Sequence, residues 1–293
     1  MFYTLENQFL KVEINSFGAE PSSVRDASGQ ERLWTADPAV WKRHAPMLFP
    51  IVGRLKGGGY TLGGKPYQIS QHGFARDNEF RATVHEQERL VLELTETAET
   101  LAHYPFRFTL SVEYRLEGDT LVKAHTVWNR SEKPLYYELG GHEGYCIALT
   151  EGERMRDSYI LFPGMTEIHP IQTDENVFLT EKKGCLPLTD GKLYLTPGLF
   201  DGDALILDDL TCKTLVLGSD KNSSRVTVAF EGFGYMGIWS KPGVEEPGYV
   251  CIEPWSALPD GAYLDSALEH KVGVRQLAAG QQETLAYRMA FEV

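Results

Sequence analysis

Apolar and polar residues alternate along much of this chain, in short runs. Clear examples lie at residues 10–14, 90–94 and 108–114, where every second side chain is apolar. Similar patterns recur at 121–127, 214–217 and 225–230. A period of two residues is typical of strands with one buried and one exposed face. The chain is therefore predicted to consist mainly of strands.

Turn-forming residues separate these runs, at 26–29, 62–65, 117–119 and 279–281. Helical patterns are scarce, and we expect short helices only at 96–103 and 38–42. Residues 158–199 alternate less and contain more Gly and Pro, which favours long connections with short strands. Many strands with few helices predict an all-β fold, a large antiparallel β-sandwich. No linker or low-complexity run interrupts the chain, so residues 1–293 are expected to form a single domain.

The charge balance excludes several classes of partner. Lys and Arg number 28 against 41 Asp and Glu, a net charge of −13, and this opposes binding to nucleic acid or to anionic membranes. The chain has no apolar stretch long enough to span a membrane and no basic, then apolar, leader at its start, so we expect a cytoplasmic protein. The four cysteines are far apart and form no metal-binding spacing, which predicts reduced thiols and no structural metal site.

The first segment that suggests chemistry runs from residue 46 to 76. It places Arg54 after a glycine, and His72 and Arg76 on either side of a Gly-Phe-Ala sequence. Glycine lets a backbone approach a ligand closely, and guanidinium groups donate several hydrogen bonds in fixed directions. The alternative is structural: both arginines pair with surface acids, and His72 caps a turn.

The second segment is Leu139-Gly140-Gly141-His142-Glu143-Gly144-Tyr145. Two glycines free the backbone to place His142 in a cleft, and the unperturbed pKa of histidine suits proton transfer near neutrality. A turn histidine that is satisfied by a backbone carbonyl is the competing interpretation.

The third segment contains Trp239 and, after a short interval, Cys251-Ile252-Glu253-Pro254-Trp255. Glu253 follows an apolar run, and we expect Pro254 to end that strand or to confine it to a sheet edge. Burial beside Trp255 would raise the pKa of Glu253 into the range of a general base. A strand-end glutamate paired with an arginine is the structural alternative, and both tryptophans also suit a core.

Taken in order, these segments resemble the aldose 1-epimerase (galactose mutarotase-like) family, and specifically its LacX-like branch. The motifs are PMLFPIVGRLKGG, QHGFAR, GGHEGY, GIWSKPG and CIEPW. The resemblance implies a galactose mutarotase-like antiparallel sandwich that interconverts the α and β anomers of a free aldose without a metal or cofactor.

The resemblance also implies roles for individual residues. Glu253 would be the general base and His142 the general acid, with His72 beside them and Arg54 and Arg76 orienting sugar hydroxyls. A family aspartate is matched by Asp203, with Asp208 as the competing candidate. From its residue type, Trp239 offers a flat apolar face that suits the mixed surface of a sugar.

This chain differs from the sequence pattern of the branch at two places near the site. Where the branch commonly has GGHPAF, this chain places Glu143 next to His142, and we expect that charge to raise the pKa of the histidine. Trp255 is followed by Ser256-Ala257-Leu258-Pro259-Asp260-Gly261, where the branch usually has a glycine soon after the tryptophan, so this loop is expected to shape a different pocket.

Other functions remain open from the residues alone. Arg54, Arg76 and Lys241 would suit a phosphorylated hexose, whereas a non-catalytic carbohydrate-binding module would not require both His142 and Glu253. A glycoside hydrolase needs a second carboxylate about 5–9.5 Å from the first, for which Asp203 and Glu143 are the candidates. In each case the partner is a small sugar, and the protein is expected to be a monomer or a homodimer.

Overall fold

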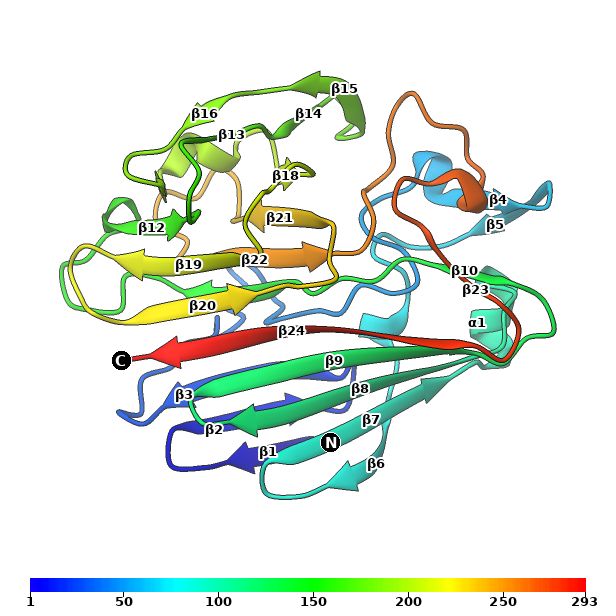
Figure 1. Ribbon diagram of the computed structural model, residues 1–293, viewed down its shortest axis with the longest axis horizontal. Coiled ribbons are helices and arrows are strands. Elements are labelled where there is room, and N and C mark those ends of the chain that lie inside the picture. The colour runs from blue at the N-terminus through cyan, green and yellow to red at the C-terminus, as the bar shows by residue number, and fades with distance from the viewer.

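Two large antiparallel sheets and four smaller ones form most of the chain in the computed structural model, which describes residues 1–293 (Figure 1). The larger sheet has nine strands, in the order β17 (Lys192–Tyr194), β12 (Ser158–Leu161), β19 (Thr214–Ser219), β20 (Arg225–Ala229), β24 (Gln282–Glu292), β9 (Thr120–Asn129), β8 (Phe108–Glu117), β7 (Arg89–Thr95) and β6 (Arg81–His85). The other has six strands, in the order β11 (Glu143–Cys146), β22 (Tyr249–Trp255), β21 (Tyr235–Trp239), β18 (Leu205–Leu207), β14 (Ile171–Thr173) and β15 (Leu179–Lys183). The prediction of a large antiparallel β-sandwich is confirmed.

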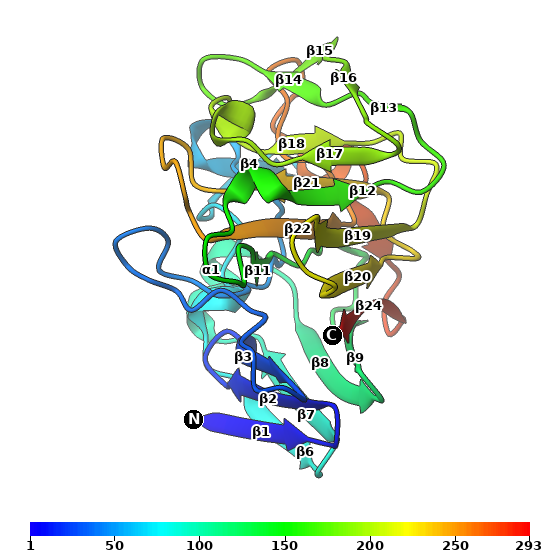
Figure 2. The same ribbon diagram turned by 90° about the vertical axis from the view of Figure 1, so that its left-hand side faces the viewer.

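The smaller sheets flank these two. They comprise β1 (Phe2–Glu6), β2 (Leu10–Asn15) and β3 (Glu20–Asp26), and the pairs β4 (Gly59–Leu62) with β5 (Lys65–Gln68), β10 (Leu135–Tyr137) with β23 (Arg275–Leu277), and β13 (Glu167–Ile168) with β16 (Leu186–Pro187). Strand β1 contacts β7 and β8, so the three-stranded sheet lies beside one end of the nine-stranded sheet (Figure 2). The six-stranded sheet and the β13–β16 pair lie at the other end, where the cavity described below is found.

Hydrophobic alternation accounts for the long strands. Burial alternates along β8 and along most of β24 and β9, which place their apolar side chains in a cluster of 58 buried residues that extends from Leu5 to Phe291. The two-residue turn between β8 and β9 has Gly118 at a φ of +65°, a conformation that favours glycine. Burial of apolar surface on this scale is the main favourable contribution to folding.

Helices are few and short. They are α1 (Ala98–His103) and the 3₁₀ turns η1 (Lys56–Gly58), η2 (Ala75–Asp77), η3 (Met155–Asp157), η4 (Pro197–Phe200) and η5 (Leu268–His270). Thr97 caps α1, because its side chain accepts a hydrogen bond from the Thr100 N–H. None of these helices has the length and apolar character needed to cross a membrane.

The structure corrects two local predictions. Residues 38–42 form a turn and a bend rather than a helix. Pro254 does not end its strand, since β22 continues to Trp255. Strand β11 pairs with β22 only as far as Ile252. No β11 residue therefore requires the backbone N–H that proline lacks. The Pro254 carbonyl accepts a hydrogen bond from the Gly141 N–H. Residues 158–199 contain several short strands between long connections, as expected.

Candidate active site

A cavity of about 930 Å³ opens over the six-stranded sheet and the loops beside it. Its wall includes every side chain that the sequence singles out for catalysis or sugar binding, namely His72, His142, Glu253, Arg54, Arg76, Asp203 and Trp239. Asp208, the competing aspartate, does not line the cavity and instead binds Lys183, with 2.5 Å between the carboxylate oxygen and Nζ. Asp203 has a φ of +83° and lies just before β18.

Glu253 lies on the cavity face of β22. Its partner across the ladder is Gly237 in β21, where a Cβ atom would be 2.4 Å from the Trp255 ring. Only glycine therefore fits beneath that indole. Glu253 is 1% exposed, and burial raises its pKa well above the usual carboxyl value, with the charges of Asp203 and Glu143 adding to the effect.

His142 faces Glu253, with 3.3 Å between its Nε2 and the carboxylate Oε2. The preceding Gly141 is needed because a Cβ there would lie 2.2 Å from the Tyr287 hydroxyl. The pKa of His142 is lowered to about 3, mainly by burial, with the charges of Arg76 and Arg43 adding to the effect.

Glu143 does not act on His142 as the sequence led us to expect. Glu143 pairs with Ile252 across the ladder, so its side chain lies on the face opposite to that of Glu253. There it binds the Lys123 ammonium at 2.8 Å, between the two large sheets. The prediction that Glu143 raises the pKa of His142 is wrong, because burial of the imidazole outweighs a charge that is paired on the far side of the sheet.

His72 completes a group of three titratable side chains. It has a φ of +65° and is followed by Gly73, where a Cβ would lie 2.2 Å from the Phe49 carbonyl oxygen. Its Nδ1 accepts a hydrogen bond from the Gly53 N–H at 3.1 Å, so in the neutral ring the proton is on Nε2. Burial lowers the pKa of His72 well below its usual value, with His142 and Arg76 adding to the effect. The His72 ring stands perpendicular to that of His142, with centroids 5.6 Å apart.

Aromatic rings enclose His142. Trp41 stacks on the imidazole at a centroid distance of 5.1 Å, and Trp239 meets it edge-on at 5.8 Å. Tyr249 stacks behind Trp41 at 5.2 Å. Trp41 was not among the residues predicted for the site, since it lies in an irregular loop with no local motif.

Arginines line the same side of the cavity as the histidines. Arg76 donates from Nη2 to the Gln71 carbonyl at 2.7 Å, and Arg54 is exposed to the cavity. Arg43, which the sequence did not single out, also lines the cavity and binds Asp77 at 2.7 Å.

The loop after Trp255 contributes one residue to the wall. Pro259 lines the cavity and lies so close to Gly53 that a Cβ there would be 2.5 Å from its ring. Asp260 accepts a hydrogen bond from the Lys56 N–H at 2.9 Å, which fixes the loop against the segment that carries Arg54.

Two groups of side chains have the composition of a metal site. The ligand atoms of His142, Cys251 and Glu253 lie within 4.8 Å of one another, and so do those of Glu167, His169 and Cys185 at the surface. In the first group, the imidazole and the carboxylate also form a buried pair of titratable groups, with 3.3 Å between Nε2 and Oε2.

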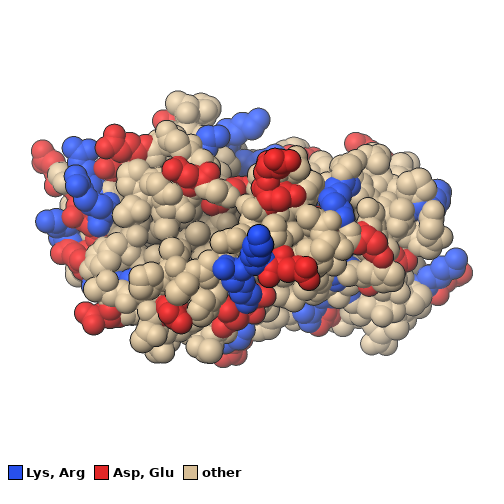
Figure 3. All heavy atoms as spheres, turned by 90° about the horizontal axis from the view of Figure 1, so that it is seen from above, with Lys and Arg blue, Asp and Glu red and all other residues tan.

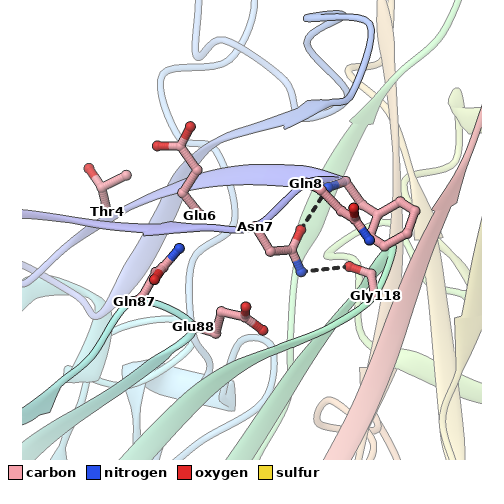
Figure 4. A pocket seen from close by; sticks show the side chains of 8 residues that line it. Thr4, Glu6, Asn7, Gln8, Gln87, Glu88 and Gly118 are labelled. Atoms are coloured by element: carbon pink, nitrogen blue, oxygen red, sulfur yellow. Dashed lines mark hydrogen bonds between the residues drawn. The ribbon is translucent and has the colours of Figure 1, made fainter.

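A second hollow, of about 760 Å³, lies between the β1–β2 turn and the turns that follow β6 and β8 (Figure 4). The Asn7 amide donates to the Gly118 carbonyl there, at 2.9 Å. Its lining includes Glu6 and Glu88 but neither histidine nor cysteine, so it offers no acid–base pair of the kind formed by His142 and Glu253.

Comparison with known proteins gives a consistent result. The model of the family described as aldose 1-epimerase matches residues 1–272. A galactose mutarotase related enzyme from Lactobacillus acidophilus has a structure with a TM-score of 0.95 and 36% identity, over 100% of this chain and 98% of that one. A galactose mutarotase-like protein from Lactobacillus casei has a TM-score of 0.92 and 30% identity over all of both chains. The plasmid-encoded protein LacX of Lactococcus lactis is 30% identical over 285 residues, which are 94% of this chain and 95% of LacX.

Proposed function

The chain belongs to the aldose 1-epimerase family, which makes it an isomerase of the mutarotase type, and we propose that Glu253 and His142 transfer the protons on a free aldose. The observation that carries this proposal is the buried pair itself, with 3.3 Å between His142 Nε2 and Glu253 Oε2 at the wall of the cavity. General acid–base catalysis requires two such groups within reach of one substrate.

The form of the pair that acts in catalysis holds one proton. Burial raises the pKa of Glu253 and lowers that of His142, so in the free protein this proton lies on the carboxyl group. The contact at 3.3 Å lets it move to the imidazole, which leaves a carboxylate beside an imidazolium. The two protonation states have the same total charge, so the proton is transferred within the pair and none is exchanged with solvent.

Ring opening then uses both groups. Glu253 takes the proton from the anomeric O1 hydroxyl while His142 delivers one to the ring oxygen O5, and the C1–O5 bond breaks to give the open-chain aldehyde. Rotation about the C1–C2 bond presents the other face of the carbonyl, and the ring closes with the proton transfers reversed. Each positioned acid or base typically contributes about 10²–10⁴-fold to such a reaction.

The remaining side chains bind and orient the sugar. His72 presents Nε2–H as a donor, since its Nδ1 is occupied by the Gly53 N–H. Arg54, Arg76 and Asp203 supply donors and acceptors for hydroxyl groups, and Trp41 and Trp239 supply flat apolar faces for the C–H surface of the ring.

Polarimetry tests this proposal directly. The purified protein is expected to accelerate the change in optical rotation of a freshly dissolved aldose in proportion to enzyme concentration. A protein that binds the sugar but leaves this rate at its value in buffer would be a carbohydrate-binding module instead.

We also propose that residues 1–293 form one domain that works in the cytoplasm as a monomer or homodimer. The single large apolar cluster, which draws on residues from Leu5 to Phe291, supports one domain. All four cysteines are free, which suits a reducing compartment. The face shown in Figure 3 mixes acidic and basic side chains and offers no continuous basic surface for nucleic acid.

A further inference from the structure

Cationic side chains gather at the cavity although the chain as a whole carries a net charge of −13. Four of them line it: Arg43, Arg54, Arg76 and Lys241. The cavity also has acidic residues, which come from segments 174–175 and 201–203 and from Glu253.

Arginine charges act on both histidines of the site. Arg43 and Arg76 line the same cavity as His72 and His142. Their charges add to burial in lowering the pKa of each imidazole.

The four cationic side chains of the cavity have few carboxylate partners. Arg43 and Arg76 share one carboxylate, Asp77, at 2.7 Å and 3.5 Å, and Arg54 and Lys241 have no carboxylate within 4.0 Å. Arg76 and Arg43 repel each other, and this repulsion adds to burial in lowering the pKa of Arg76. An anion bound between them would relieve that repulsion.

These guanidinium groups also have donors to spare. Each has five N–H groups, but Arg43 makes one hydrogen bond, to Asp77, and Arg76 makes one, to the Gln71 carbonyl. The buried Arg76 Nε faces Asp77 Oδ2 at 3.5 Å but makes no hydrogen bond. Guanidinium forks match the spacing of oxygens in phosphate and carboxylate groups.

The cavity has room for more than a plain monosaccharide. Its volume of about 930 Å³ lies near the upper end of the range of about 300–1,000 Å³ found for small-molecule sites. An aldose with an additional substituent therefore fits the available space.

We propose that the sugar acted on here carries an oxyanion, a phosphate monoester or a carboxylate, on a carbon other than C1, and that Arg43 and Arg76 bind it. This inference rests on the proposed mutarotase function, because the anomeric hydroxyl must remain free. The bound anion also offsets the charges of Arg43 and Arg76, which add to burial in lowering the pKa of His142.

Calorimetric titration tests binding separately from turnover. The protein used is the Glu253→Gln variant, titrated with glucose, galactose, their 6-phosphates and glucuronate. We expect one of the anionic sugars to bind at least about 10-fold more tightly than its neutral parent, because a charge-assisted hydrogen bond typically contributes that much. The comparison of the 6-phosphates with glucuronate distinguishes phosphate from carboxylate.

Arginine variants then locate the subsite. Arg43→Gln and Arg76→Gln are each expected to weaken binding of that anionic sugar by about 10- to 100-fold, and by much less for the neutral sugar. Arg81→Gln is the matched control, because Arg81 is 80% exposed on β6 and does not line the cavity. Thermal unfolding of each variant verifies that it is folded.

Two results would overturn the inference: equal affinity for every neutral and anionic sugar of the panel, or tight anion binding that survives both arginine substitutions. Turnover by the wild-type protein is a separate readout. Anomer exchange of neutral sugars without tighter anion binding would leave the mutarotase function intact and remove only the anionic substrate.

Discussion

The buried pair of Lys123 and Glu143 joins the two large sheets directly behind the active site. Lys123 lies in β9 and Glu143 in β11, their side chains are 0% and 1% exposed, and the ammonium and carboxylate are 2.8 Å apart. The Tyr287 hydroxyl donates a second hydrogen bond, at 2.5 Å, to the same carboxylate oxygen. Removing the Lys123 charge leaves Glu143 buried with this single neutral donor.

We therefore expect Lys123→Met to lower the free energy of unfolding by about 3–5 kcal/mol, the usual cost of breaking a buried ion pair from one side. Methionine has nearly the volume of lysine, so little of this cost comes from a cavity. The double variant Lys123→Met/Glu143→Leu removes both charges and is expected to be more stable than Lys123→Met alone, because no buried charge is left unpaired.

Urea denaturation, followed by intrinsic fluorescence, measures these differences. Lys183→Met is the matched control, since Lys183 forms a pair with Asp208 at the surface, where it is 38% exposed, and such pairs contribute about 0–1 kcal/mol. The reasoning would be refuted if Lys123→Met cost no more than Lys183→Met, or if the double variant were less stable than Lys123→Met.

Two further predictions concern the site. The pKa of His142 is lowered to about 3 and that of Glu253 is raised, so the one-proton form of the pair persists over a wider pH range than unperturbed groups would allow. We expect kcat/KM to stay level through pH 6.5 and down to pH 5, and limbs at the ordinary pKa values of glutamate and histidine would contradict this. Gly237→Ala places a methyl group 2.4 Å from the Trp255 ring. We expect it to cost about 1–3 kcal/mol in stability and to lower activity. Gly234→Ala meets nothing within 4 Å and should cost less stability than Gly237→Ala in a thermal-unfolding assay.

Sequence patterns predicted the fold class well because alternation is a local signal. Strand β8 shows it in full, with every second side chain buried. The glycine-flanked positions of His72 and His142 also signalled where the backbone is unusual, and the structure places both at one cavity.

Features that depend on long-range register were not predictable in the same way. Which face of the sheet Glu143 occupies is decided by its pairing with Ile252, and no local pattern fixes that pairing. Arg43 and Trp41 lie in a loop without regular structure, so their approach to His142 follows from how that loop packs. The prediction of a raised pKa for His142 was wrong for the same reason, since adjacency in sequence did not mean adjacency in space.

The most direct test of the account is the rate of anomer exchange for Glu253→Gln and His142→Gln beside the wild-type protein. Polarimetry or saturation transfer on the best aldose substrate would supply kcat for each, with the exposed Glu13→Gln variant as the control. We predict that each site substitution lowers kcat by about 10²–10⁴-fold and that the double variant is little worse than the poorer single one, because the two groups act as a unit in the same step. A folded Glu253→Gln variant that exchanges anomers at the wild-type rate would contradict the account.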